Sequence, residues 1–508
     1  MVLPAPVPDR QPRVERDQVD LEALEAWLKR RDPVRWALGA MVVVWSLIFI
    51  RLGLQRHDRF GTFGFDLGIY DQAIWLLSRF KTPFITIRGL NFWGHHFNPA
   101  LALFVPFYWL GAGPHFLLVA QVASQASGAL AIFLLARDRL RDRWPAVVLA
   151  AVLLLNPTYQ YLTWEFFHPD ALAIGPLLFA YWAARARKWG WFAVATLLAL
   201  ACKEDVALAV VVLGALIAAR GDRRIGLAVS GVAAAWFLVA TRLIIPAANG
   251  IGPFYASFFS DFGSSAGEVV RNVVTHPGKT YEVATRPDRL SYYRMMFAPV
   301  AFLPLVAAPT LLIGVPMLAI NALSAFPYQH EIRYHYAALV LAGIMLATVE
   351  AVAVLGRTAA ARAFFVGLVA ATSLASTVAW GPSPLGVKFH SGLWVLQSDG
   401  RAAARERAVG LVPAGAPASV HYQFSAHMTH RSKIYEWPAP WKPANWGVRG
   451  ENLDDPVGVE WLALDRQLLG PEDKAMLAGL LAGEFAVRYQ QRNSVVAQRE
   501  RPSAGTSP

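Results

Sequence analysis

The chain has 508 residues, of which 55% are hydrophobic and only 16% are charged, and its mean hydropathy is +0.37. Soluble domains carry roughly a quarter charged residues, so this composition, gathered into long apolar runs, excludes an ordinary soluble protein and predicts a polytopic membrane protein. A formal net charge of +12 does not indicate nucleic-acid binding, because the basic residues lie between apolar runs and not together with aromatic residues on one polar face. The single cysteine, Cys202, excludes an intrachain disulfide and a cysteine-rich metal cluster.

Residues 1–34 are polar, and we expect a cytoplasmic N-terminal segment with an amphipathic helix at 21–29 and no cleaved signal peptide. From 35 to 380, the apolar runs predict an all-α membrane bundle of about eleven spans. Residues 97–113 are apolar but contain Pro99 and Pro106, so we expect a re-entrant or interfacial helix there. The expected spans are 36–54, 115–136, 144–162, 169–184, 189–202, 206–219, 225–245, 295–308, 309–326, 336–356 and 363–380.

Basic residues between the spans predict how the bundle is oriented. Lys and Arg cluster in some of the connections, which the positive-inside rule places in the cytoplasm together with the N-terminus. These connections are 29–31, 137–143, 185–188, 220–224 and 357–362. The polar stretches without a basic excess then share the opposite, external face, including the loops 55–114 and 246–294. The shorter external stretches are 165–170, 203–205 and 327–335.

After residue 380 the hydropathy falls and turn residues become frequent. The short segments "ASVHY", "EWLALD" and "FAVRYQ" are typical of strands. We therefore expect a small extracytoplasmic α/β domain at 381–495, followed by a disordered tail at 496–508.

Two aspartates follow the first span in "GTFGFDLGIYDQAIW". Asp66 and Asp71 lie five positions apart among aromatic and aliphatic residues, which is an unusual place for charge. The alternative to a catalytic role is that they cap a helix, as an aspartate at an N-cap does. Both are candidate catalytic residues.

Further ionisable residues fall in very short connections between spans. Because such groups lie at the bilayer boundary or in a cavity, they are candidates for function. Glu165 and His168 in "WEFFHPD" are possible ligands of a divalent cation, through oxygen and imidazole. His96, Lys203, Arg333 and His335 are candidates for binding a phosphate or substrate, with Arg242 and Arg294 as weaker options; Lys203 in "KED" has the alternative of pairing with its neighbouring acids.

Several motifs occur in order along the chain: "FDLGIYDQAIW", "HHFNPALALFVPFYWL", "FHPDALAI", "LLALACKEDVAL", "WFLVATRLIIP" and "RYHYAALV". On these motifs the chain is identified as a member of an uncharacterised family of bacterial polytopic membrane proteins, domain of unknown function 2079. Its layout resembles the GT-C glycosyltransferases, which use polyprenyl-phosphate-linked sugars. That resemblance implies an essential acid in the first external loop, where Asp66 stands, and a second acidic motif near Glu165. The chain departs from the GT-C pattern in one respect: it lacks a plain "DxD" or "WWDYG" signature, the kind of motif expected at the second acidic site.

The resemblance implies an inverting transferase of the bacterial plasma membrane that moves a sugar from a lipid-linked donor to a glycan, lipid or protein acceptor. Asp66 is then the general base. The departing phosphate is held by Lys203, by Arg333, or by a Mg²⁺ or Mn²⁺ ion. The lipid tail lies against residues 97–113. One alternative is a transporter or flippase of a lipid-linked or anionic substrate. The other is a non-catalytic scaffold for envelope assembly. A single shared cavity favours the enzyme over the scaffold.

Overall fold

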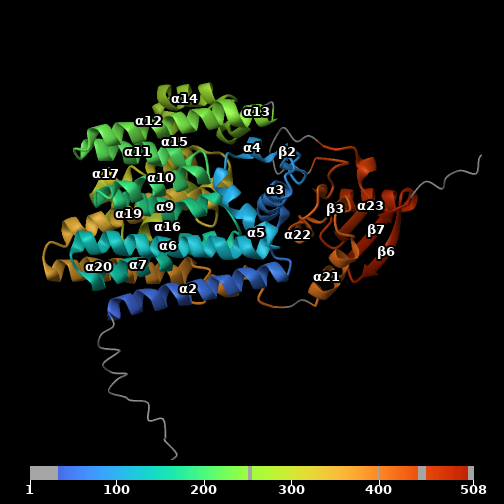
Figure 1. Cartoon of the computed structure of the whole chain (residues 1–508), viewed down its shortest axis with the longest axis horizontal. Coiled ribbons are helices and arrows are strands. Elements are labelled where there is room, and N and C mark those ends of the chain that lie inside the picture. The colour runs from blue at the N-terminus through green and yellow to red at the C-terminus, as the bar shows by residue number, and fades with distance from the viewer. Residues whose placement is uncertain (1–31, 250–253, 398–399, 444–452, 501–508) are drawn as a thin grey trace, which may run out of the picture.

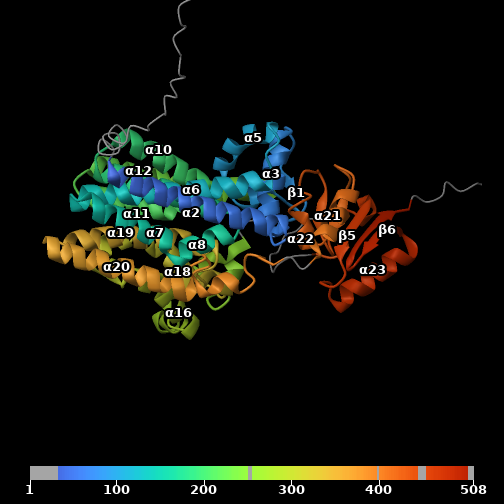
Figure 2. The ribbon, with the colours of Figure 1, turned by 90° about the horizontal axis from the view of Figure 1, so that it is seen from below.

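The computed structural model describes residues 32–249, 254–397, 400–443 and 453–500, so the expected helix at 21–29 lies outside the described residues. The described chain forms an elongated helical bundle with a mixed α/β domain at one end (Figure 1). A second view at right angles shows the same separation of the two parts (Figure 2).

Most expected spans correspond to helices of the bundle. Among the described residues, five helices are long and apolar enough to cross a membrane, or up to seven if each of two bent pairs is one span. The bend of 49° between α7 and α8 falls at Asn156 and Pro157, where the proline cannot continue the hydrogen-bond ladder of α7. The bundle helices are α2 (Pro33–Asp58), α6 (Pro114–Leu140), α7 (Arg143–Leu155), α8 (Pro157–Trp164), α9 (Pro169–Arg185), α10 (Trp189–Cys202), α11 (Val206–Ala219), α12 (Arg223–Val239), α19 (Ala338–Leu355) and α20 (Ala359–Trp380).

The two spans expected at 295–308 and 309–326 are wrong. The chain instead makes a bent pair, Pro287–Val300 and Leu303–Leu311, whose halves meet at 87°. Prolines at 299, 304, 309 and 316 interrupt the helical hydrogen bonds, and Ala301 and Phe302 adopt positive φ at the bend. The elements here are α16 (Pro287–Phe297), α17 (Ala308–Leu311) and α18 (Val315–Leu323).

The segment expected to be re-entrant or interfacial forms a 3-10 turn, Pro99–Phe104, followed by α5 (Val105–Trp109). It is one of the shorter apolar helices, and its Leu103 and Leu110 side chains are exposed. Length and exposure both fit the expected placement. The other short elements of the loops are β1 (Phe84–Ile85), β2 (Leu90–Asn91), α3 (Ile69–Ser78), α4 (Phe92–His95), α13 (Ile245–Asn249), α14 (Ala266–Thr275) and α15 (Pro277–Ala284).

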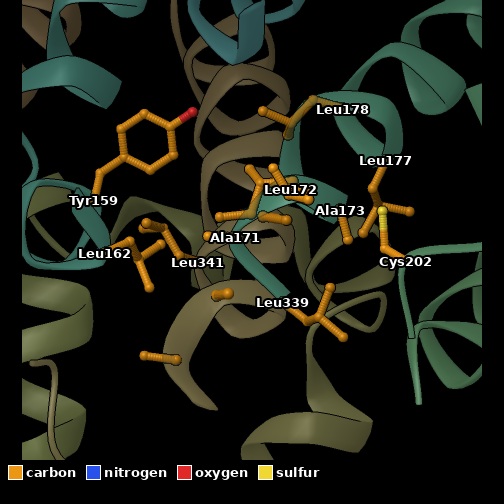
Figure 3. Close-up of a cluster of buried hydrophobic side chains, with 14 of the residues drawn as sticks. Tyr159, Leu162, Ala171, Leu172, Ala173, Leu177, Leu178, Cys202, Leu339 and Leu341 are labelled. Atoms are coloured by element: carbon orange, nitrogen blue, oxygen red, sulfur yellow. The ribbon is translucent and has the colours of Figure 1, made fainter. Parts of the chain in front are cut away.

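Helix α19 is the centre of the bundle, because every residue from Ala338 to Val352 is buried. Its leucines pack with side chains of α8, α9 and α10, and the thiol of Cys202 is buried among them (Figure 3). Close packing of this kind holds the helix ends in fixed positions. The polar residues next to these helix ends are therefore held in fixed positions relative to one another.

The α/β domain contains one mixed five-stranded sheet, in the order β4-β3-β5-β7-β6. The strands β4, β3 and β5 are parallel, while β7 runs antiparallel to β5 and β6. Residues 496–499, expected in the disordered tail, belong to β7, because buried Val495, Val496 and Ala497 complete the sheet. The elements are α21 (Ala402–Leu411), β3 (Ala418–Val420), α22 (Tyr422–Ser425), β4 (Ile434–Glu436), β5 (Trp461–Asp465), α23 (Pro471–Gly483), β6 (Phe485–Gln491) and β7 (Ser494–Arg499).

The carboxyl ends of β3 and β4 face the loop that follows α2. Gly64 in this loop lies so close to the α/β domain that a Cβ atom there would overlap Ser425 Oγ and Glu436 Oε1. Those two atoms are themselves joined by a buried hydrogen bond of 2.8 Å. The domain therefore packs directly on the segment that carries Asp66.

We expect Gly64→Ala to lower the free energy of unfolding by about 1–3 kcal/mol, because the added methyl has no space against Ser425 and Glu436. Thermal unfolding of the purified protein measures this change. Gly39→Ala is the matched control, since a Cβ at Gly39 meets nothing within 4 Å and alanine favours the helix. Equal stability of the two variants would contradict the close packing of the domain on this loop.

Candidate functional site

A cavity of about 1250 Å³ opens at the end of the bundle next to the α/β domain. Side chains from all five polar stretches predicted to share one face line it, so their convergence is confirmed; which side of the membrane they face remains a prediction. The ionisable residues in its lining are Asp66, His95, His96, Glu165, His168, Lys203, Glu204, Asp205, Arg242 and His335.

Asp66 lies in a π-helical turn, Gly64–Gly68, between α2 and α3. Its side chain is 31% exposed and faces the cavity, with Oδ1 3.4 Å from His168 Nε2. Phe63, Phe65 and Tyr70 surround it on the cavity wall. The carboxylate is thus accessible to a bound molecule while aromatic rings limit the space around it.

Glu165, His168 and His335 form a compact cluster beside Asp66. Glu165 follows α8, His168 precedes α9, and His335 precedes α19, so three helix ends position them. His335 Nδ1 lies 2.9 Å from Glu165 Oε1, and the two imidazole rings stack with centroids 4.0 Å apart. One ligand atom from each residue lies within 4.8 Å of the others.

The cluster has buried polar atoms without hydrogen-bond partners in the described part of the chain. These are Glu165 Oε2 and both ring nitrogens of His168. Burial raises the pKa of Glu165 well above its usual value, and the carboxylates of Asp66 and Asp170 raise it further. A cation placed among these atoms satisfies them and restores the charged carboxylate, so the residues present fit a divalent metal ion.

Lys203 lies in the connection between α10 and α11, and its charge is balanced by two acids. Nζ lies 2.9 Å from Asp170 Oδ1 and 3.1 Å from Asp205 Oδ2, with the lysine and Asp170 buried. The neighbouring Glu204 accepts from Phe97 N at 3.0 Å and contacts His96 Nδ1 at 2.8 Å. The "KED" sequence therefore organises a buried polar network that reaches the cavity on one side.

The structure places Asp71 and Arg333 outside the cavity lining. Asp71 is fully buried; it accepts from Tyr108 Oη at 2.5 Å and from Thr429 Oγ1, and lies 3.1 Å from His430 Nε2. Its surroundings are those of an anchor between α3, α5 and the α/β domain, so the structure does not bring Asp71 into the cavity with Asp66. Arg333 forms an ion pair with Glu331 and is not positioned to hold a phosphate in the cavity.

Arg56, which the sequence reasoning did not single out, lies behind the cavity wall against two aromatic residues that line the cavity. It is buried near the end of α2, its guanidinium lies over Trp164 and Phe166 at 4.4 and 4.2 Å, and it favours the charged form of Glu165. The sequence did contain a signal for Arg56: the positive-inside rule predicts that this end of the first span is external, and arginine is unusual at a predicted external end.

The other half of the cavity is apolar. Its wall is built mainly by α12, α14 and α18, and residues 97–113 do not line it. Val270 and Val274 on α14 line the cavity and remain 66% and 73% exposed. The apolar wall thus continues to the outer surface of the bundle. Its apolar side chains include Leu208, Phe237, Val269, Val270, Val273, Val274, Met317, Ile320, Leu323 and Phe326.

Fold and cavity together define a polytopic membrane protein whose helical bundle holds a large cavity beside an α/β domain. The family model "Predicted membrane protein (DUF2079)" matches residues 56–491, and the chain belongs to this family. The crystal structure of ArnT from Cupriavidus metallidurans in the apo state is similar, with a TM-score of 0.53 and 14% sequence identity over 94% of this chain and 98% of that chain. At this identity the likeness shows the fold alone, while the family match confirms the membership that the motifs predict. No curated protein matches the chain.

Proposed function

We propose that the chain is a membrane-embedded, inverting glycosyltransferase that moves a sugar from a polyprenyl-phosphate-linked donor to a cell-envelope acceptor. The observation that carries this proposal is that one cavity contains an accessible carboxylate, cationic side chains and an apolar wall that reaches the bundle surface. A non-catalytic scaffold does not need these three features in one cavity. The fold shared with ArnT is consistent with the GT-C layout that the sequence resembles.

In this proposal Asp66 accepts the proton of the acceptor hydroxyl as its oxygen attacks the anomeric carbon of the donor. The bond from that carbon to the phosphate oxygen breaks in the same displacement, which inverts the configuration and leaves polyprenyl phosphate. The positive charges of Arg242 and Lys203 at the cavity stabilise the departing phosphate. Lys203 contributes only in part, because Asp170 and Asp205 already neutralise it.

Glu165, His168 and His335 are the residues that would hold a divalent cation, which when bound supplies positive charge to the phosphate. Two imidazoles and one carboxylate suit Mn²⁺ better than Mg²⁺, which prefers oxygen ligands. The apolar wall of α12, α14 and α18 accommodates the polyprenyl chain. We place the cavity and the α/β domain on the extracytoplasmic face of a bacterial plasma membrane, in accordance with the basic connections at the other end.

Removal of the cation is expected to lower the release of polyprenyl phosphate by the full-length protein, and Mn²⁺ is expected to restore it better than Mg²⁺. Equilibrium dialysis of Mn²⁺ gives a second readout that does not depend on activity. His168→Ala is expected to weaken Mn²⁺ binding by more than about 100-fold, because loss of even an outer-shell partner weakens metal sites 10–100-fold.

His115→Ala is the control for this measurement, since His115 lies on α6 outside the cluster and pairs with Asp58. Equal Mn²⁺ binding by both variants would exclude the cluster as the metal site. Normal movement of the lipid-linked sugar across the bilayer without any release of polyprenyl phosphate would favour the transporter instead.

A further inference from the structure

A second, smaller cavity of about 200 Å³ lies at the opposite end of the bundle. Helix α9 connects the two sites: its first residues adjoin the large cavity, and its last residue, Arg185, lines the small one. Its 17 residues span about 25 Å, so the small cavity is not part of the site described above. Its polar lining consists of Tyr181, Arg185, Arg187, Arg220 and Asp222.

Glu350 on α19 lies behind this cavity and is already saturated with partners. Arg139 Nε lies 2.8 Å from its Oε2, and Arg185 Nε lies 3.3 Å from its Oε1. The Tyr181 hydroxyl donates to Oε1 at 2.9 Å. Both carboxylate oxygens of Glu350 are thus occupied by these partners.

Arg220 remains without a carboxylate in the described part of the chain. Its guanidinium lies 3.2 Å from the Thr310 hydroxyl and 5.5 Å from the centre of the Tyr181 ring, neither of which carries a negative charge. Arg187, in contrast, pairs with Asp222 at 2.5 Å. Four arginine side chains and two carboxylates therefore lie around the cavity. The net charge of this group is positive, and the arginine without a carboxylate partner is Arg220.

Exposed tryptophans at the same end of the bundle indicate the level of this cavity in the membrane. Trp36, Trp144 and Trp191 are more than half exposed and stand in the first turns of α2, α7 and α10. Tryptophan is enriched where the hydrocarbon meets the headgroups. The small cavity thus lies at headgroup depth, where basic pockets between helices bind anionic lipids.

We propose that this cavity, formed by α9, α11 and the turn before α12, binds a phosphate group through Arg220, and that the phosphate belongs to the headgroup of an anionic phospholipid. The planar guanidinium offers two parallel donors to phosphate oxygens, while Arg185 and Arg187 add charge from α9 and the turn after it. The Tyr181 hydroxyl is held by Glu350 and Thr310, so it shapes the pocket without competing for the ligand. The inference is independent of the proposed transfer reaction.

The test compares the full-length protein in nanodiscs of phosphatidylcholine with the same protein in nanodiscs that also contain phosphatidylglycerol. Thermal unfolding and native mass spectrometry report stabilisation and retained lipid. We expect phosphatidylglycerol to raise the unfolding temperature of the wild type and of Arg357→Gln, whose arginine is exposed in the turn between α19 and α20. Arg220→Gln is expected to lose that rise and to retain about tenfold less phosphatidylglycerol.

An equal rise in Arg220→Gln and the wild type overturns the proposal, as does no rise at all. A separate arm adds inorganic phosphate to the phosphatidylcholine nanodiscs: an Arg220-dependent rise there identifies a soluble anion as the ligand and overturns the lipid assignment. If Arg220→Gln does not fold, Arg220→Lys replaces it, because lysine keeps the charge but lacks the planar fork. That variant is expected to retain less phosphatidylglycerol than the wild type, and equal retention overturns the proposal.

Discussion

Replacing Asp66 with asparagine is expected to lower the turnover of a polyprenyl-phosphate-linked sugar by about 10²–10⁴-fold, the usual contribution of a positioned general base. Asparagine keeps the size of the side chain and removes its ability to accept the proton of the acceptor hydroxyl. Since Asp66 is partly exposed in a loop, the variant is expected to fold normally and to bind the donor. The measurement is the initial rate of polyprenyl phosphate release by wild type and variant at saturating donor.

Asp58→Asn is the matched control, because Asp58 ends α2 only a few residues earlier, is exposed and pairs with His115 outside the cavity. It is expected to retain the rate of the wild type. A rate for Asp66→Asn close to that of Asp58→Asn would remove Asp66 from the chemistry.

The second large effect is a loss of stability on substitution of Lys203. We expect Lys203→Met to lower the free energy of unfolding by about 3–5 kcal/mol, because the change leaves the buried carboxylate of Asp170 and the half-buried one of Asp205 without their cation. The length and apolar stem of methionine keep the packing largely unchanged. Unfolding in increasing denaturant, followed by tryptophan fluorescence in detergent, measures the difference.

The double variant Lys203→Met with Asp170→Asn separates charge from packing. Removing the closer acid is expected to recover part of the lost stability, since fewer unpaired charges then remain buried. Lys188→Met is the control, because Lys188 lies over the ring of Trp182 and forms no ion pair within the described residues. This change is expected to alter stability by less than about 1 kcal/mol. A Lys203→Met variant as stable as this control would show that the buried network contributes little.

Much of the candidate site was predictable because of where its residues sit relative to the spans. Glu165, His168 and Lys203 fall in connections too short to leave the bilayer boundary, and the basic connections at the other end of the bundle assign them a common face. Because these connections join helix ends on one face, the residues can be predicted to lie close together without any knowledge of side-chain packing. The same reasoning predicted that Asp66 joins them, since it follows the first helix at that face.

The role of Asp71 was not predictable, because its partners Thr429 and His430 lie more than 350 residues away in another domain. Spacing within "DLGIYD" carries no information about that contact. The bent pair at 287–311 was missed for a different reason: a hydropathy window registers apolar residues but not the loss of helical hydrogen bonds at successive prolines. The pairing of Arg333 with Glu331, two positions away, was not anticipated either, because sequence spacing does not show which partner a long side chain selects.

The central claim is that the large cavity transfers a sugar from a lipid phosphate. Its most direct test incubates the purified full-length protein with a panel of polyprenyl-phosphate-linked sugars and candidate acceptors, and detects free polyprenyl phosphate by mass spectrometry. The account predicts release from at least one donor, together with an acceptor that has gained the sugar. Transport of intact donor across a reconstituted bilayer, with no polyprenyl phosphate formed from any member of the panel, would contradict it.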